Sequence, residues 1–78
     1  MDQSHDIHIG ELIRQAMKAQ GRKNYWLAEQ IYVQPSAISK IYKRKSIDTE
    51  QLRLISQALG VDLFQHYSSN LNNSQKSK

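Results

Sequence analysis

The fold is decided by residues 24–42, which read NYWLAEQIYVQPSAISKIY. Apolar residues recur at helical spacing in both halves of this stretch, namely Leu27, Ala28 and Ile31 and then Ile38 and Ile41. Pro35 separates the halves, because proline suits the first position of a helix and disfavours helical geometry at the residue before it. We therefore expect two short helices that meet at a tight turn, the second over 35–42, with the small Ala28 where they cross.

The residues before this stretch predict an amphipathic first helix. Its apolar residues follow one face of a helix, and they are Ile9, Leu12, Ile13, Ala16 and Met17. Gly21 supplies the usual C-terminal stop, and Lys18 lies near the negative end of the helix dipole. This helix is therefore expected to bury one face and to end at Gly21.

Two further helices are predicted after the central stretch. Asp48 and Gln51 have the spacing of a capping box, which opens a helix that ends at Gly60. Asp62 repeats that cap spacing before a last short helix. The apolar residues of these two helices are Leu52, Ile55 and Leu59, then Phe64 and Tyr67. The sequence thus predicts an all-α fold of five helices, and no strand pattern competes with it.

Length and composition narrow the class of protein. A chain of 78 residues allows one domain, and the absence of cysteine argues against disulfides, zinc fingers and iron–sulfur clusters. No apolar stretch approaches the ~20 residues of a membrane span, and the polar, acidic start does not resemble a secretory signal, so we expect a cytoplasmic protein. We expect a flexible N-terminus over 1–6, the folded domain over 7–67, and a disordered polar tail over 68–78.

The net charge of +4 is unevenly distributed. Within residues 14–45, Glu29 is the single acidic residue. Residues 1–13, by contrast, contain three acidic residues and no lysine or arginine. The basic residues of this middle part are Arg14, Lys18, Arg22, Lys23, Lys40, Lys43, Arg44 and Lys45. A basic segment inside a folded region favours a polyanionic partner; a solvated surface is the plainer alternative.

The pattern resembles the helix-turn-helix of the Xre/Cro family of phage-repressor-like regulators. Residues 9–14 look like the first helix of that family, 27–31 like its second, 36–41 like its recognition helix, and 57–62 like the junction before its fifth helix. The resemblance covers roughly residues 8–67. It implies a five-helix lambda-repressor-like DNA-binding domain.

The sequence departs from the family at three places. Tyr32 stands where the family usually has a turn glycine; because positive φ is uncommon for tyrosine, the turn is expected to differ locally. Asn24 replaces a glutamine that braces the recognition helix and touches a phosphate; its shorter side chain puts the bracing role in doubt. Met17 and Tyr42 replace an arginine–glutamate pair, so we expect these two side chains to touch, with the tyrosine hydroxyl left toward solvent or phosphate.

In this family the start of the recognition helix enters the major groove, and dimers read two half-sites. The positions that this resemblance assigns to base contact are Gln34, Pro35, Ser36, Ser39 and Lys40. Gln34 could pair with adenine and Lys40 with guanine; ordinary helix-start chemistry is the alternative for Gln34 and the two serines. The positions assigned to DNA phosphates are Arg22, Lys23, Asn24, Tyr42, Lys43, Arg44 and Lys45.

We therefore expect a bacterial or phage-type regulator that binds double-stranded DNA by sequence, as a homodimer on its site. The scattered His5, His8 and His66 and the few carboxylates form no catalytic set, and no glycine-rich phosphate loop is present. Neither enzymatic activity nor a metal or cofactor is expected. No membrane association is expected either.

Two other functions stay open at this point. Pro35, Trp26 and Leu54 would suit a protein-interaction module, such as an antitoxin or adaptor that retains the fold. Tyr25, Trp26 and Tyr42 would suit nonspecific or single-stranded nucleic-acid binding by stacking. Trp26 would cover the rim of the core or meet a partner, and Leu54 would be a half-buried core residue or a dimer contact.

Overall fold

The computed structural model describes residues 7–67, and its secondary structure is helical. Four complete helices follow one another, namely α1 (Ile9–Gln20), α2 (Asn24–Gln30), α3 (Pro35–Tyr42) and α4 (Thr49–Leu59). Residues 65–67 are also helical, where a fifth helix was predicted, and no strand occurs within residues 7–67. The all-α expectation is therefore confirmed. The expected flexible N-terminus (1–6) and polar tail (68–78) lie outside the described residues.

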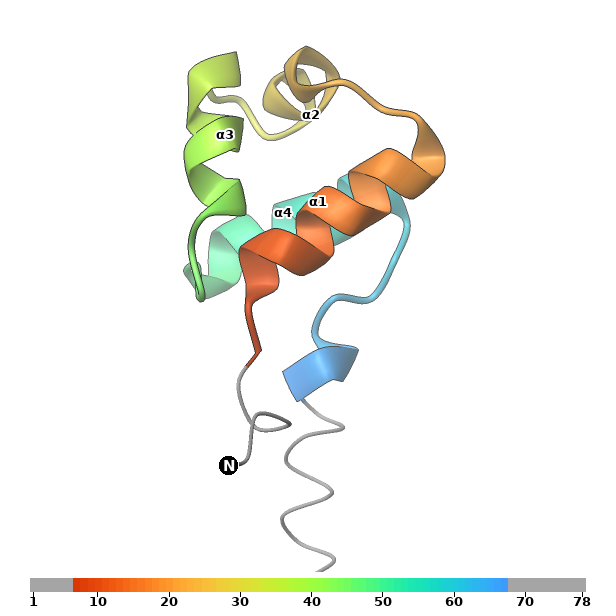
Figure 1. The fold of residues 1–78 in the computed structure, drawn as a ribbon, viewed down its shortest axis with the longest axis vertical. Helices are drawn as coiled ribbons and strands as arrows, with labels where there is room; N and C mark the ends of the chain where they lie inside the picture. The colour runs from red at the N-terminus through yellow and green to blue at the C-terminus, as the bar shows by residue number, and fades with distance from the viewer. Residues whose placement is uncertain (1–6, 68–78) are drawn as a thin grey trace, which may run out of the picture.

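Helix α3 runs upright along one side of the molecule, and α2 lies beside its upper end, viewed nearly along its axis (Figure 1). Helices α1 and α4 lie below α2, with α4 behind α1 in this view (Figure 1). Helix α2 packs on α3 and α4, and α1 packs on α3. Residues 24–42 thus form two helices at a steep angle rather than one rod, as the apolar pattern and Pro35 predict. No helix among the described residues is long and apolar enough to cross a membrane.

Three helix ends share the same backbone motif, with one residue in the left-handed conformation. At the ends of α1 and α4 this residue is glycine, Gly21 (φ 67°) and Gly60 (φ 71°), as predicted. At the end of α2 it is Tyr32, with φ 62°. The Val33 amide donates to the Ala28 carbonyl over 3.0 Å, which is the bond expected of this type of helix end. The turn therefore keeps the conformation for which glycine is suited, and the expected local difference does not occur.

The core is made of apolar side chains from all four helices. Among the described residues, no polar or charged side chain is buried. The fully buried large side chains are Ile9, Ile13, Leu27, Ile38 and Ile55. Ala28, the small residue expected at the helix crossing, is buried, with 1% of its surface exposed. Leu54 is half-buried and packs on this core, which favours its interpretation as a core residue.

The start of α1 lies against the end of α3 and the loop that follows it. A β-carbon on Gly10 would lie 2.3 Å from the Ile41 carbonyl oxygen, so only glycine allows this approach. The amides of Ile9 and Gly10 donate to the carbonyls of Lys45 and Arg44 over 3.0 and 2.9 Å. These bonds satisfy two amides that a helix start leaves without partners, and they fix the path of the basic loop.

Candidate nucleic-acid interface

The buried residues of α3 and the predicted base-contacting residues lie on different faces of the helix. Ile38 and Ile41 are buried, and Ile38 is fully so. All five predicted base-contacting positions are exposed: Gln34, Pro35, Ser36, Ser39 and Lys40. Gln34 is the N-cap of α3, but its side chain makes no capping hydrogen bond. Its amide is therefore not occupied by ordinary helix-start chemistry.

A short hydrogen-bond network joins α2 to α3 through Asn24. The Asn24 side-chain amide donates to Ser39 Oγ over 3.3 Å, and the Tyr42 hydroxyl donates to Asn24 Oδ1 over 2.9 Å. The expectation that the Tyr42 hydroxyl is left toward solvent or phosphate is therefore wrong. Asn24 does brace α3 despite its short side chain, because the long tyrosine reaches across to it. Met17, which we expected to touch Tyr42, lines the same pocket as Tyr42.

The surroundings of Tyr42 favour the neutral phenol. Partial burial raises the pKa of the Tyr42 hydroxyl above its usual value, and the positive charge of Arg14 offsets part of that rise. A neutral phenol keeps the proton that it donates to Asn24. The network is thus intact at neutral pH.

Trp26 and Arg22 form a stacked pair at the start of α2. The Arg22 guanidinium carbon lies 4.1 Å from the centre of the Trp26 ring, a distance typical of a cation–π contact. Trp26 is half-buried and packs on the core, so it covers the core rim, one of the two alternatives left by the sequence. Helical spacing could not have predicted this pair, because Arg22 lies before the first residue of α2.

The loop after α3 carries three exposed cations, Lys43, Arg44 and Lys45. The Lys43 and Arg44 amides continue the end of α3 by donating to the carbonyls of Lys40 and Ile41 over 3.1 and 3.0 Å. The Arg44 side chain donates to the Ser46 carbonyl over 3.4 Å. These predicted phosphate-contacting residues therefore project from a loop whose main chain is fixed.

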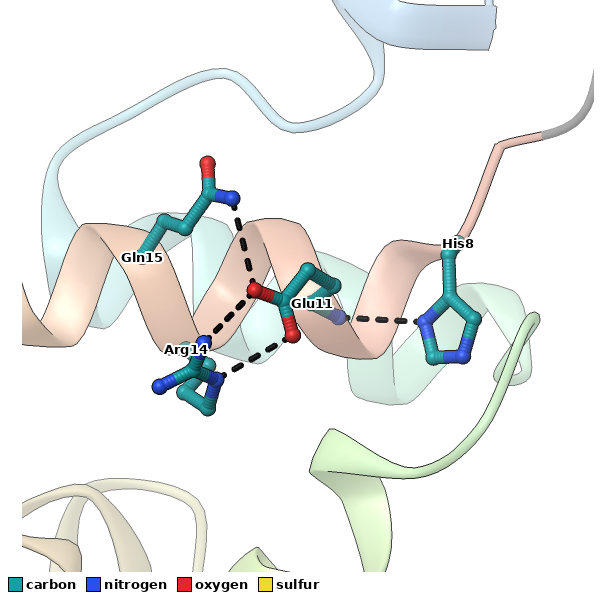
Figure 2. A network of polar contacts seen from close by, with 4 residues as sticks. All are labelled: His8, Glu11, Arg14 and Gln15. Carbon is teal, nitrogen blue, oxygen red and sulfur yellow. Dashed lines mark hydrogen bonds and ion pairs between the residues drawn. The ribbon is translucent and has the colours of Figure 1, made fainter. Parts of the chain in front are cut away.

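A polar network at the start of α1 links four residues (Figure 2). His8 Nδ1 accepts from the Glu11 amide over 3.2 Å, so this histidine caps α1. Glu11 accepts two hydrogen bonds from Arg14, at 3.1 and 2.7 Å, and a longer one from Gln15 at 3.4 Å. Hydrogen bonding by Arg14 lowers the pKa of the Glu11 carboxyl. Within residues 7–67, no group of three metal-ligating side chains gathers.

Arg14 and Lys18 lie close to the predicted phosphate-contacting residues, which the sequence analysis did not anticipate. Both line one pocket together with Arg22, Lys23, Asn24 and Tyr42. The family resemblance assigns DNA contacts to α2, α3 and the loop after α3, and none to α1. The available signal was the basic segment 14–45, which begins at Arg14.

The family described as Helix-turn-helix matches residues 13–65, which is more than half of the chain. The chain therefore belongs to the Xre/Cro-type helix-turn-helix family. It is a DNA-binding helix-turn-helix protein. Searches of curated proteins and of solved structures found no match.

Proposed function

We propose that this protein is a bacterial or phage-type transcriptional regulator that recognises a specific double-stranded DNA sequence with α3. The observation that supports this most strongly is the division of α3, in which Ile38 and Ile41 are buried while the five predicted base-contacting positions are exposed. A helix with one face in the core and short polar side chains on the other fits the width of the major groove. On this proposal the protein acts in the cytoplasm, where its DNA is.

The base contacts follow from the chemistry of the exposed side chains. Gln34 pairs through its free amide with the N6 and N7 atoms of adenine, and Lys40 donates to guanine O6 or N7. Ser36 reaches a base or a phosphate, and the ring of Pro35 packs against a thymine methyl group. Ser39 accepts from Asn24 and still has its own hydroxyl proton to donate.

The phosphate contacts supply affinity and fix the position of α3 in the groove. We assign them to Arg22, Lys23, Asn24, Tyr42, Lys43, Arg44 and Lys45. The one hydroxyl proton of Tyr42 is donated to Asn24, so Tyr42 contributes by holding Asn24 in place, and the second hydrogen of the Asn24 amide is the one offered to a phosphate. If about five charges are neutralised, the logarithm of the binding constant falls against the logarithm of salt concentration with a slope of about −4 to −5.

The proposal is tested by selecting bound sites from a random duplex pool, followed by titrations of the selected and a random duplex at physiological salt. A specific regulator selects a defined site and binds it at least about a thousandfold more tightly than random DNA. Gln34→Ala should reduce that ratio, whereas Lys43→Gln should weaken both duplexes equally. A chain that binds no duplex at low salt contradicts the proposal.

A homodimer on DNA is part of this proposal, and it makes a separate prediction. Two copies related by a two-fold axis read half-sites one helical turn apart, about 34–36 Å centre to centre. The selected sites should then be palindromic. A set of selected sites without this symmetry shows that one copy acts alone.

Of the alternative functions, stacking on single-stranded nucleic acid has little support. Tyr25 is 68% exposed, but the Trp26 ring is covered by Arg22 and Tyr42 is half-buried and tied to Asn24. The three aromatic residues therefore do not present a common set of open ring faces.

A further inference from the structure

A basic pocket lies between the end of α1 and the start of α2, next to Tyr42. Its volume is about 430 Å³. The polar side chains that line it are those of Arg14, Lys18, Arg22, Lys23, Asn24 and Tyr42. No aspartate or glutamate lines it. Four cationic side chains around one hollow raise the local concentration of anions.

Four of these side chains, those of Arg14, Arg22, Asn24 and Tyr42, are already held by partners within the chain. Glu11 binds Arg14 through two nitrogen atoms, and the Trp26 ring lies against the Arg22 guanidinium. Asn24 is held by Ser39 and Tyr42. Side chains that are held before binding lose little conformational freedom when a ligand arrives. The pocket is therefore organised in advance for an anion.

Arg14 keeps hydrogen-bonding capacity for such an anion. A guanidinium has five N–H donors. Glu11 accepts from only two of them, one on Nε and one on a terminal nitrogen. Figure 2 shows the other terminal nitrogen of Arg14 pointing away from the Glu11 carboxylate. Glu11 thus orients Arg14 without using all of its donors.

We propose that Arg14 and Lys18 extend the DNA-contacting surface onto α1, because this pocket adds them to the phosphodiester site that the proposed function assigns to the start of α2. The proposal rests on the proposed function. Its link to base reading is Asn24, which lines the pocket and also donates to Ser39 on the exposed side of α3. A phosphate in the pocket therefore lies one side chain away from the groove-reading surface and fixes the register of α3.

Arg53 provides a matched comparison for Arg14. It pairs with Glu50 three residues earlier on α4, as Arg14 pairs with Glu11 on α1, and both arginine side chains are 48% exposed. Arg53 does not line the pocket. A difference between these two arginines in DNA binding therefore reports the pocket rather than a lost surface ion pair.

The first experiment compares Arg14→Gln, Lys18→Gln and Arg53→Gln in the full chain by fluorescence titration with duplex DNA across a salt series. Arg14→Gln and Lys18→Gln should each make the salt slope shallower by about 1, and each should weaken selected and random duplexes by the same factor. Arg53→Gln should leave the slope unchanged, and circular dichroism shows that each variant is folded.

The outcomes separate this inference from the proposed function. If the wild-type chain binds duplex DNA but all three variants keep its slope, the pocket assignment is wrong and the proposed function stands. If the wild-type chain binds no duplex, both are wrong.

A second experiment distinguishes a DNA phosphate from a free one. In labelled protein, the NMR signals of the Arg14 Nε–H group and the Asn24 side-chain amide should shift when a duplex is added, and Arg14→Gln should abolish the Asn24 shift. Inorganic phosphate alone should shift them only weakly. Strong shifts with inorganic phosphate and none with DNA would show that the pocket serves a free anion, which overturns the assignment.

Discussion

The Tyr42 hydroxyl lies 2.9 Å from Asn24 Oδ1, so the last residue of α3 is bonded to the first residue of α2. At its other end, α2 is joined to α3 by the turn through Tyr32, where Val33 bonds to Ala28. The two helices are therefore fixed to each other at both ends of α2. Their relative orientation depends on a hydrogen bond as well as on apolar contacts.

Replacing Tyr42 with phenylalanine should destabilise the fold by about 0.5–1.5 kcal/mol, the usual net value of one hydrogen bond. The ring remains to fill its place, so the loss isolates the hydroxyl. Urea denaturation should show a lower midpoint with an unchanged slope. An unchanged midpoint would mean that the bond to Asn24 contributes nothing.

The same variant predicts an alkaline pH dependence. Because burial raises the pKa of Tyr42 in the folded chain, its contribution to stability is complete below the unfolded value of about 10 and is lost as pH rises through the higher folded value. The stability advantage of wild type over Tyr42→Phe should therefore be constant up to about pH 9 and shrink above about pH 10. Thermal melts of both proteins from pH 8 to 11 test this, and a constant difference across the range contradicts it.

Gly10→Ala should be among the most damaging substitutions in the chain. Its β-carbon would lie 2.3 Å from the Ile41 carbonyl oxygen and 2.5 Å from that of Tyr42, and backbone atoms cannot turn aside as a side chain does. We expect a loss of about 3 kcal/mol, the upper end for overpacking. Gly21→Ala is the control: its β-carbon meets nothing within 4 Å, so only the left-handed backbone costs energy, about 1 kcal/mol. Equal losses in the two variants would refute the close α1–α3 contact.

Tyr32→Gly should stabilise the protein. The left-handed conformation costs a non-glycine residue about 1–2 kcal/mol, and the Tyr32 side chain is 86% exposed, so little packing is lost. Glycine costs about 0.5–1 kcal/mol in the unfolded chain, which leaves a gain of about 0.5–1 kcal/mol. Tyr32→Asn should give a smaller gain, because asparagine only tolerates this conformation. A lower melting temperature for Tyr32→Gly would contradict the account.

Stability should fall in acid partly through Glu11. Arg14 holds the Glu11 pKa below its usual value, so the ion pair stabilises the fold above the ordinary value of about 4.3 and stops doing so as pH falls through the lowered one. Wild-type melting temperature should thus decline below about pH 5, and Glu11→Gln should decline less. Arg53 lowers the pKa of Glu50 in the same way. The melting temperature of Glu50→Gln should therefore also decline less in acid than that of wild type. Superimposable curves for wild type and both variants would refute the effect.

Most of the fold could be predicted because strong local signals coincide with apolar spacing. Pro35 determines where α3 begins, Gly21 and Gly60 follow the ends of α1 and α4, and the Asp48 side chain caps α4 by accepting from the Gln51 amide over 2.7 Å. Tyr32 shows the limit of such reasoning. Tyrosine prefers negative φ, but the energy of this preference is smaller than that of the contacts on both sides of the turn. Those contacts hold the backbone at Tyr32 in the left-handed conformation.

The contacts within the site were harder to predict because they depend on reach across the fold. Asn24 and Tyr42 are 18 residues apart, so no local pattern connects them. The shorter asparagine suggested a lost brace, and the tyrosine suggested a free hydroxyl. In the structure these two departures compensate, because the longer tyrosine spans the gap that the shorter asparagine leaves. The position of Arg14 depends on the fold in a similar way, since only the fold brings it to the pocket beside the start of α2.

The main-chain bonds from Ile9 and Gly10 to the loop after α3 have a consequence for how the protein can change. Since the main-chain carbonyls of Arg44 and Lys45 accept hydrogen bonds from α1, this anchor of the loop backbone does not depend on which side chains the loop carries. On the proposed function, overall attraction to DNA and the choice of base sequence are then separable traits: the first would be adjusted at 43–45, the second at 34–40. Such independence would let a lineage, or an engineer, retune binding strength while the preferred operator stays the same.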